Sequence, residues 1–199
     1  MHKEIEAKFL NIDKQAIIER LKELGAVKVF DEFLQRRCVY NLCKGSPEDW
    51  IRLRQEHNKV TLTYKSVNKA KGIHGVKEIE VIVDDFDKAR EFLKAIGLQE
   101  RAYQENLRVR YYLEKDDVTF DIDTWPGLPP YIEIEGPSEE VVKKYAKLLG
   151  FKWEDAVFGS TDLIYAQVYN VTPDFIRYKC PVLSFDNIPW ELTRANLRR

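Results

Sequence analysis

Hydrophobic and polar positions alternate along much of this chain, which is the pattern of β-strands that bury one face. The three most acidic of these runs are KEIEAKF at 3–9, KEIEVIV at 77–83 and YIEIEG at 131–136. Turn sequences such as EHNK, EKDD and PGLPP separate further alternating runs: VKVFDEFLQRRCVYNL, WIRLRQE, KVTLTYKSV, NLRVRYYLEK and VTFDIDTW. We therefore expect about eight strands in an α+β chain, enough to close a barrel.

Three segments have the marks of helices: 13–24, 87–96 and 138–149. Each begins at a polar residue and ends immediately before a glycine, as helix termini prefer. Each also follows one of the three acidic strands, and the tetrapeptide KEIE occurs at both 3–6 and 77–80. A repeated strand and helix unit indicates internal duplication within a pseudo-symmetric fold.

Ionisable side chains of both signs occupy one parity of strand after strand, while the other parity is apolar. The charged positions are Glu4, Glu6, Lys8, Arg52, Arg54, Lys65, Glu78, Glu80, Arg108, Arg110, Asp121, Asp123, Glu133 and Glu135. If the helices cover the apolar face, the charged face lines the inside of the barrel. The alternative is a solvated outer face that carries many surface salt bridges, and for one pair taken alone it is an equally good interpretation.

Charges of both signs inside a barrel require partners, because desolvating them is costly. Carboxylate oxygens suit hard cations such as Mg²⁺ or Mn²⁺, whereas arginine and lysine suit phosphate oxygens. A polyanion bridged to the carboxylates by a divalent metal would satisfy both sets of side chains.

The composition of the chain bears on which classes of partner and which cellular location are expected. The chain has 32 basic and 33 acidic residues and a formal charge of −1, so a general electrostatic footprint for nucleic acid or membrane is not expected. No apolar run approaches the roughly 20 residues of a membrane span. The cysteines Cys38, Cys43 and Cys180 lack metal-ligand spacing, and a reducing cytoplasm is the expected location.

The order of these charges resembles the CYTH superfamily, the triphosphate tunnel metalloenzymes, which includes class IV adenylyl cyclases, thiamine triphosphatases and inorganic triphosphatases. The E-x-E-x-K signature of that family is matched by residues 4–8. The expected later positions follow in order: Arg52 and Arg54, Lys65, Glu78 and Glu80, Arg108 and Arg110, Asp121 and Asp123, Glu133 and Glu135. The resemblance covers roughly residues 1–165.

This resemblance implies an eight-stranded antiparallel β-barrel that holds a triphosphate, with covering helices. It implies metal binding by Glu4, Glu6, Asp121, Glu133 and Glu135, and phosphate binding by Lys8, Arg52, Arg54, Lys65, Arg108 and Arg110. Supporting roles fall to Glu78, Glu80 and Asp123, and the expected catalytic residues are Glu6, Lys8, Lys65 and Arg110. The expected cofactor is Mg²⁺ or Mn²⁺.

The first functional hypothesis is metal-dependent hydrolysis of a triphosphate, because this reaction needs only phosphate and metal contacts. The candidate substrates are inorganic tripolyphosphate, a nucleoside triphosphate and thiamine triphosphate. The alternatives are a class IV adenylyl cyclase that makes cyclic AMP and pyrophosphate, and a non-catalytic nucleotide or polyphosphate binder. If a base is recognised, Trp125 is the first residue to test. We expect one domain over 1–199, with 169–199 as a C-terminal extension, and a homodimer fits a barrel of this size.

Overall fold

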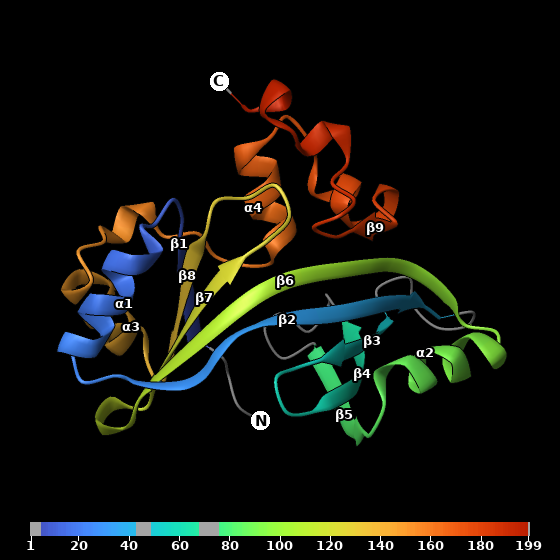
Figure 1. Cartoon of the computed structure of the whole chain (residues 1–199), viewed down its shortest axis with the longest axis horizontal. Coiled ribbons are helices and arrows are strands. Elements are labelled where there is room, and N and C mark those ends of the chain that lie inside the picture. The colour runs from blue at the N-terminus through green and yellow to red at the C-terminus, as the bar shows by residue number, and fades with distance from the viewer. Residues whose placement is uncertain (1–4, 43–48, 68–75, 199) are drawn as a thin grey trace. The chain divides into compact units, whose positions relative to one another are not determined.

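The computed structural model describes residues 5–42, 49–67 and 76–198 (Figure 1). The strands are β1 (Ile5–Phe9), β2 (Val27–Asn41), β3 (Trp50–Gln55), β4 (Val60–Val67), β5 (Val76–Val83), β6 (Gln99–Leu113), β7 (Val118–Thr124), β8 (Tyr131–Gly136) and β9 (Val182–Leu183). The α-helices are α1 (Lys14–Glu23), α2 (Phe86–Ala95), α3 (Glu139–Leu148) and α4 (Thr161–Val168). Single helical turns are Glu114–Asp116, Trp153–Asp155, Phe175–Lys179, Trp190–Leu192 and Arg194–Asn196.

Eight strands form one sheet in the order β1-β8-β7-β6-β2-β3-β4-β5, and the two-residue β9 adds to β6 in parallel. The pairs β1/β8, β8/β7, β7/β6, β2/β3, β3/β4 and β4/β5 are antiparallel. The expected α+β fold with an antiparallel sheet is therefore confirmed. Over the described residues, no hydrogen-bonded ladder joins β1 to β5, so hydrogen bonds do not close this sheet into a barrel.

The chain divides into two compact units. The first unit comprises Met1–Leu34, Asn106–Pro173 and Trp190–Arg199, and the second comprises Gln35–Glu105 and Asp174–Pro189. The long strands β2 and β6 each contribute residues to both units. The expectation of one domain over 1–199 stays a prediction.

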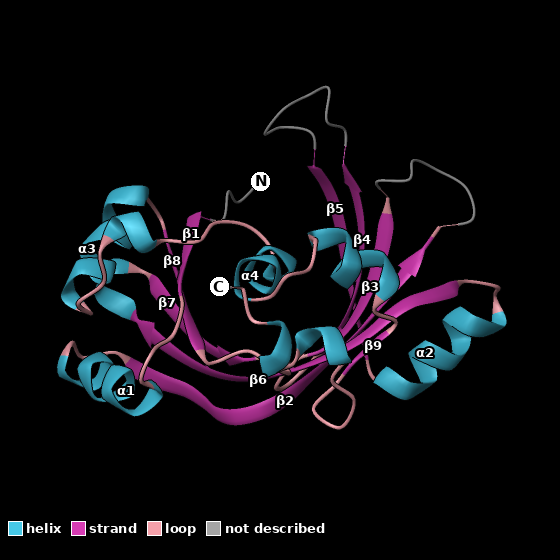
Figure 2. Ribbon diagram, turned by 90° about the horizontal axis from the view of Figure 1, so that it is seen from above, coloured by secondary structure: helices cyan, strands magenta, loops and turns pink. Residues whose placement is uncertain are grey.

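The core of the first unit lies between the apolar face of its sheet and two helices. Figure 2 shows α1 and α3 on one face of β1, β7 and β8, and α4 on the other. Fully buried strand residues such as Phe120, Ile122 and Ile134 pack with Leu21 of α1 and Tyr145 of α3. The expectation that helices cover the apolar parity is confirmed for this unit.

Capping residues fix where these helices begin. Asp13 accepts from the backbone N–H groups of Gln15 and Ala16 at 3.0 and 3.1 Å, which starts α1. The α2 helix begins earlier than residue 87, where the sequence pattern predicted its start. Asp85, rather than Asp87, is the capping residue, because Asp85 accepts from the N–H of Lys88 at 2.9 Å. Ser138 caps α3 in the same way.

The second unit has a smaller core under α2. Phe86 and Leu93 of that helix pack with Cys38, Tyr40 and Leu53 of the sheet. On the edge strand β5, Ile79 and Val81 of the apolar parity are exposed, at 63% and 50%. Helical cover of the apolar parity is therefore incomplete in this unit.

The segment after residue 156 attaches to each unit through polar contacts from its own backbone and tyrosines. In the first unit, Tyr165 and Tyr169 of the α4 region donate their hydroxyls to the carbonyls of Pro126 and Gly127. In the second unit, β9 pairs with Tyr103 and Gln104 of β6. The α4 helix escaped the sequence pattern because its residues are predominantly apolar, so no polar stripe marks it as amphipathic.

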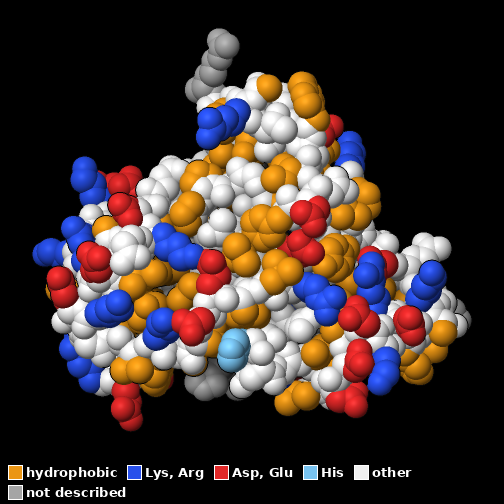
Figure 3. All heavy atoms as spheres, viewed as in Figure 1, with side chains coloured by type: hydrophobic (Ala, Val, Ile, Leu, Met, Phe, Trp, Pro, Cys, Tyr) orange, Lys and Arg blue, Asp and Glu red, His pale blue; other side chains and the backbone are white. Residues whose placement is uncertain are grey.

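Acidic and basic side chains are interspersed over the face shown in Figure 3, in keeping with the near-zero net charge. Among the described residues, every helix is too short or too polar to cross a membrane.

Replacing Ile134 tests the first unit's core. Ile134 is completely buried, so Ile134→Ala is expected to lower the free energy of unfolding by about 2–5 kcal/mol, measured by urea denaturation. The matched control is Ile82→Ala on the exposed edge strand, which should change stability by about 0.5 kcal/mol or less. Equal losses in the two variants would contradict this account of the core.

Candidate functional site

The alternation of the strands places the predicted site residues on shared faces. Their strands are β1 for Glu6 and Lys8, β3 for Arg52 and Arg54, β4 for Lys65, β5 for Glu78 and Glu80, β6 for Arg108 and Arg110, β7 for Asp121 and Asp123, and β8 for Glu133 and Glu135. Glu4 lies outside the described residues. The structure brings the others together as two sets, one within each unit.

In the first unit, strand register aligns charges of both signs in rows across the sheet. Lys8 lies opposite Glu133, which lies opposite Asp121, which lies opposite Arg110. The next row toward the β7–β8 loop contains Tyr131, Asp123 and Arg108. In the row on the other side, Glu6 and Glu135 face each other. Cross-strand neighbours of opposite sign attract, and facing carboxylates repel.

Arg108 joins the two aspartates of β7. Its Nε and Nη2 donate to the two carboxylate oxygens of Asp123 at 2.7 and 2.6 Å, and its Nη1 donates to Asp121 at 2.5 Å. Both aspartates are almost completely buried, with exposures of 1–2%. Burial by itself lowers the pKa of Arg108, but the aspartates raise it well above its ordinary value. These are charge-assisted contacts between desolvated groups, which hold one geometry strongly.

Arg110 makes a bidentate contact with Asp121, one of the two aspartates that Arg108 contacts. Its Nε and Nη2 donate to the two oxygens of Asp121 at 2.7 and 2.6 Å. Asp121 therefore accepts from two guanidinium groups at once. The expected roles of Asp121 as a metal ligand and of Arg108 and Arg110 as phosphate contacts stay predictions, because here these side chains satisfy one another.

Lys8 is buried between two glutamates. Its Nζ lies 2.5 Å from Glu6 Oε1 and 3.0 Å from Glu133 Oε2. Burial works to lower the pKa of Lys8, and the carboxylates of Glu133 and Glu6 overcome it and raise that pKa. The pKa of Glu133 is raised by burial, despite the opposing effect of Arg108 and Lys8. One ammonium group therefore incompletely compensates the carboxylates around it.

The carboxylates of the first unit have the right donor atoms for a hard divalent cation. Glu6, Glu133 and Glu135 provide oxygens alone, the ligands that Mg²⁺ and Mn²⁺ prefer. The raised pKa of Glu133 and the facing pair Glu6 and Glu135 indicate that an added cation would be favourable. Among the described residues, however, no three acidic, histidine or cysteine side chains are grouped closely enough to hold a metal ion.

In the second unit, Arg52 on the charged face differs from the paired cations of the first unit. Arg52 lies opposite Thr63, which lies opposite Glu80. Burial and, next, the neighbouring Arg54 cation lower the pKa of Arg52 to about 10, against the opposing effect of nearby glutamates. Within the described part of the chain, Arg52 has no ion pair, and its buried Nε has no hydrogen-bond partner. A partly buried guanidinium whose Nε is in this state would gain from an anion.

The other charges of this unit are already paired. Lys65 lies 3.0 Å from Glu78, and Arg54 pairs with Glu56. Thr63 donates its hydroxyl to Glu80 at 2.8 Å. The Lys65 ammonium lies 5.7 Å from the centre of the Trp50 ring, and the Arg52 guanidinium lies 6.0 Å from it, both in cation–π range.

Sequence reasoning did not single out several residues of these faces. Arg37 lies opposite Arg54, and Trp50 lies opposite Lys65. Asn106, which is completely buried, donates to Asp123 at 3.2 Å, and the buried Tyr131 hydroxyl lies 3.4 Å from Thr161. Strand parity could have indicated all of these except Thr161. Trp125, the residue proposed for base recognition, is only 3% exposed.

Comparison with protein families decides the affiliation. A family model described as the CYTH domain matches residues 2–156. The chain belongs to the CYTH family. This CYTH domain is 29% identical, over 147 residues, to a Methanocaldococcus jannaschii protein named "Putative adenylate cyclase", covering 71% of this chain and 81% of the relative.

Solved structures give the same fold. A Pyrococcus horikoshii protein superposes on this CYTH chain with a TM-score of 0.60 and 25% identity, over 78% of this chain and 94% of the other. A Vibrio parahaemolyticus protein, titled a "putative adenylate cyclase", has a TM-score of 0.65 and 13% identity, over 82% and 97%. Each superposition covers nearly the whole length of the solved protein. In this chain, the CYTH family match ends at residue 156.

Removing the charge of Asp121 tests the buried network of the CYTH domain. Asp121→Asn leaves two arginines short of a carboxylate, and it should lower the free energy of unfolding by about 3–5 kcal/mol. Asp87→Asn, which removes a carboxylate that Arg36 contacts at 3.3 Å on the surface, is the control and should have little effect. Chemical denaturation monitored by circular dichroism measures both, and a stable Asp121→Asn protein would contradict the network described above.

Proposed function

We propose that this CYTH protein is a divalent-metal-dependent enzyme that hydrolyses a triphosphate. The observation that carries the proposal is the set of buried charges of both signs on the sheet face, with carboxylates short of positive charge around Lys8 and a guanidinium short of negative charge at Arg52. A metal ion would supply the first kind of missing charge, and a phosphate group would supply the second. Membership of the CYTH family supports the assignment.

The phosphate oxygens would be bound by cations that lie partly or wholly buried on the sheet. In the first unit these are Lys8, Arg108 and Arg110, and in the second unit Arg52, Arg54 and Lys65. Arginine forks suit phosphate as well as carboxylate, so bound phosphate can replace a carboxylate partner without leaving a guanidinium unpaired. Carboxylate oxygens released in this exchange become available as metal ligands.

Glu6, Glu133, Glu135 and Asp121 are the proposed holders of Mg²⁺ or Mn²⁺, with Glu4 as a further candidate. When bound, the metal would neutralise phosphate charge and lower the pKa of an attacking water. Glu78, Glu80 and Asp123 would keep Lys65, Thr63 and Arg108 in position, as their present contacts indicate. The catalytic roles proposed for Glu6, Lys8, Lys65 and Arg110 rest on holding the terminal phosphate in line.

In hydrolysis, water attacks the terminal phosphorus and gains a bond to it, while the bridging P–O bond breaks and its electrons leave with the diphosphate. The water proton passes to solvent or to a nearby base, and the products are orthophosphate and the shortened phosphate chain. Hydrolysis needs no group that recognises a base. Among the residues discussed above, the side chains suited to this chemistry are those that bind phosphate and metal.

An adenylyl cyclase is the second candidate, because the Methanocaldococcus jannaschii relative carries that activity in its name. In that reaction the ribose 3′-hydroxyl attacks the α-phosphorus and pyrophosphate leaves. The same cations and carboxylates would serve, with the chain of phosphates bound in a different register.

Product analysis distinguishes the two reactions. The purified protein is incubated with Mg²⁺ or Mn²⁺ and, separately, with tripolyphosphate, ATP or thiamine triphosphate. Orthophosphate as the first product is expected, with activity abolished by chelation and by Glu6→Gln or Glu135→Gln in a folded protein. Cyclic AMP formed with an equal amount of pyrophosphate would refute the hydrolase proposal in favour of an adenylyl cyclase. Full activity of either variant would refute the metal assignment.

Arg52→Met tests the unpaired cation separately from catalysis. Loss of a charge-assisted phosphate contact should weaken tripolyphosphate binding by about 1.5–3 kcal/mol, measured by calorimetry. The free energy of unfolding should not fall, because Met replaces a buried charge that has no ion pair among the described residues. Lys88→Met, at a side chain that is 83% exposed, is the control. Unchanged affinity of Arg52→Met would place Arg52 outside the phosphate site.

A further inference from the structure

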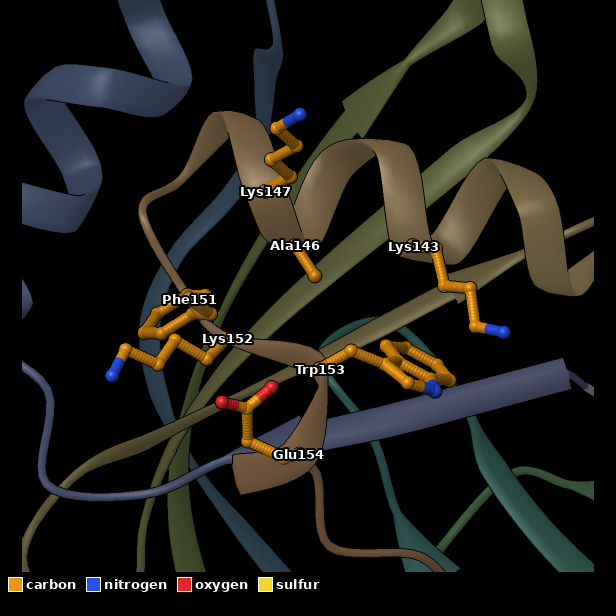
Figure 4. Close-up of a pocket in the computed structure, with 7 residues that line it drawn as sticks. All are labelled: Lys143, Ala146, Lys147, Phe151, Lys152, Trp153 and Glu154. Carbon is orange, nitrogen blue, oxygen red and sulfur yellow. The ribbon is translucent and has the colours of Figure 1, made fainter.

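A cleft lies on the helical side of the first unit, beside the C-terminal half of α3. Its volume is about 400 Å³, and its lining includes Lys143, Lys147, Phe151, Lys152 and Trp153. Figure 4 shows the rings of Phe151 and Trp153 on either side of Ala146, with Lys143, Lys147 and Lys152 around them and their ammonium groups pointing outward. The α3 helix covers the apolar face of the sheet, so this cleft is separate from the charged face described above.

The aromatic walls of the cleft are held in place by the fold. Gly150, with φ of +88°, ends α3, and the N–H of Phe151 returns to the carbonyl of Ala146 at 2.9 Å. The Phe151 ring stacks on Phe9 at 4.5 Å. Trp153 packs edge-on against Phe158 at 5.6 Å. Rings fixed in this way lose little entropy when a ligand binds.

The charges of the cleft are mostly uncompensated. Among the described residues, Lys147 and Lys152 have no carboxylate within ion-pair distance, although both line the cleft. Lys143 is shared between Glu139, at 2.6 Å, and the Trp153 ring, whose centre lies 5.0 Å from its ammonium. The only acidic side chain in the described lining is that of Glu154. The cleft therefore combines flat apolar walls with surplus positive charge.

We propose that this cleft binds a planar ring that carries a phosphate, the chemistry of a nucleoside monophosphate. The ring would lie against Phe151 and Trp153, as apolar walls of this size accommodate small ligands. The phosphate would be bound by Lys147 and Lys152. Glu154 could accept a hydrogen bond from a sugar hydroxyl or a ring amine. The site does not depend on the function proposed above.

Calorimetric titration of the whole protein with AMP, adenosine and inorganic phosphate tests this site. AMP should bind, and adenosine and phosphate should each bind about tenfold more weakly or worse, because each lacks half of the contacts. Lys147→Glu and Lys152→Glu should each weaken AMP binding by about tenfold or more. The matched control is Lys94→Glu, since Lys94 and Lys147 are each the penultimate residue of a ten-residue helix.

Three results would overturn the proposal: no AMP binding at millimolar concentration, adenosine or phosphate binding as tightly as AMP, or AMP binding that survives both lysine reversals. The last result would place AMP elsewhere on the protein. Tripolyphosphate affinity should be unchanged in Lys147→Glu. Loss of AMP binding in that variant and failure of the triphosphate hypothesis are therefore separately observable.

Discussion

The cost of removing charge from water is the constraint on which this structure depends. A strand period of two places ionisable side chains side by side on one face of the sheet, and burial leaves them only each other as partners. In the first unit the result is two clusters: Arg108 and Arg110 hold Asp121 and Asp123, and Lys8 holds Glu6 and Glu133. The buried members Lys8, Asp121 and Asp123 fix the geometry of these clusters, because each is removed from water and paired.

The two units meet this constraint differently. The first unit pairs its charges internally, yet its described face has more carboxylates than cations: Glu6, Asp121, Asp123, Glu133 and Glu135 against Lys8, Arg108 and Arg110. The second unit keeps Arg52 buried beside Arg54, and the pKa of that guanidinium falls to about 10. The first unit therefore suits a metal ion and the second suits a phosphate group, the two components of the substrate proposed above. Preformed, desolvated partners would also reduce the reorganisation needed when such a substrate binds.

The apolar side of the first unit supports this face and also has a chemistry of its own. Phe9 takes part in both, since its ring stacks on Phe151 while its strand carries Lys8 on the opposite face. The α4 helix lies beyond the family match and packs through tyrosine hydroxyls on the loop after β7. The part of the chain outside the CYTH model therefore contacts the segment that connects the Asp123 and Tyr131 strands.

The sequence by itself determined the strand alternation, the order of charges and three helices, because periodicity and capping are local properties. KEIE at both 3–6 and 77–80, and glycines at 25, 97 and 150, were sufficient for that. Only the tertiary structure decided that α4 forms from an apolar segment and that Thr161 approaches the charged face. It also decided which charges pair, since Asp121 accepts from two arginines through strand register and burial, and no local pattern encodes either.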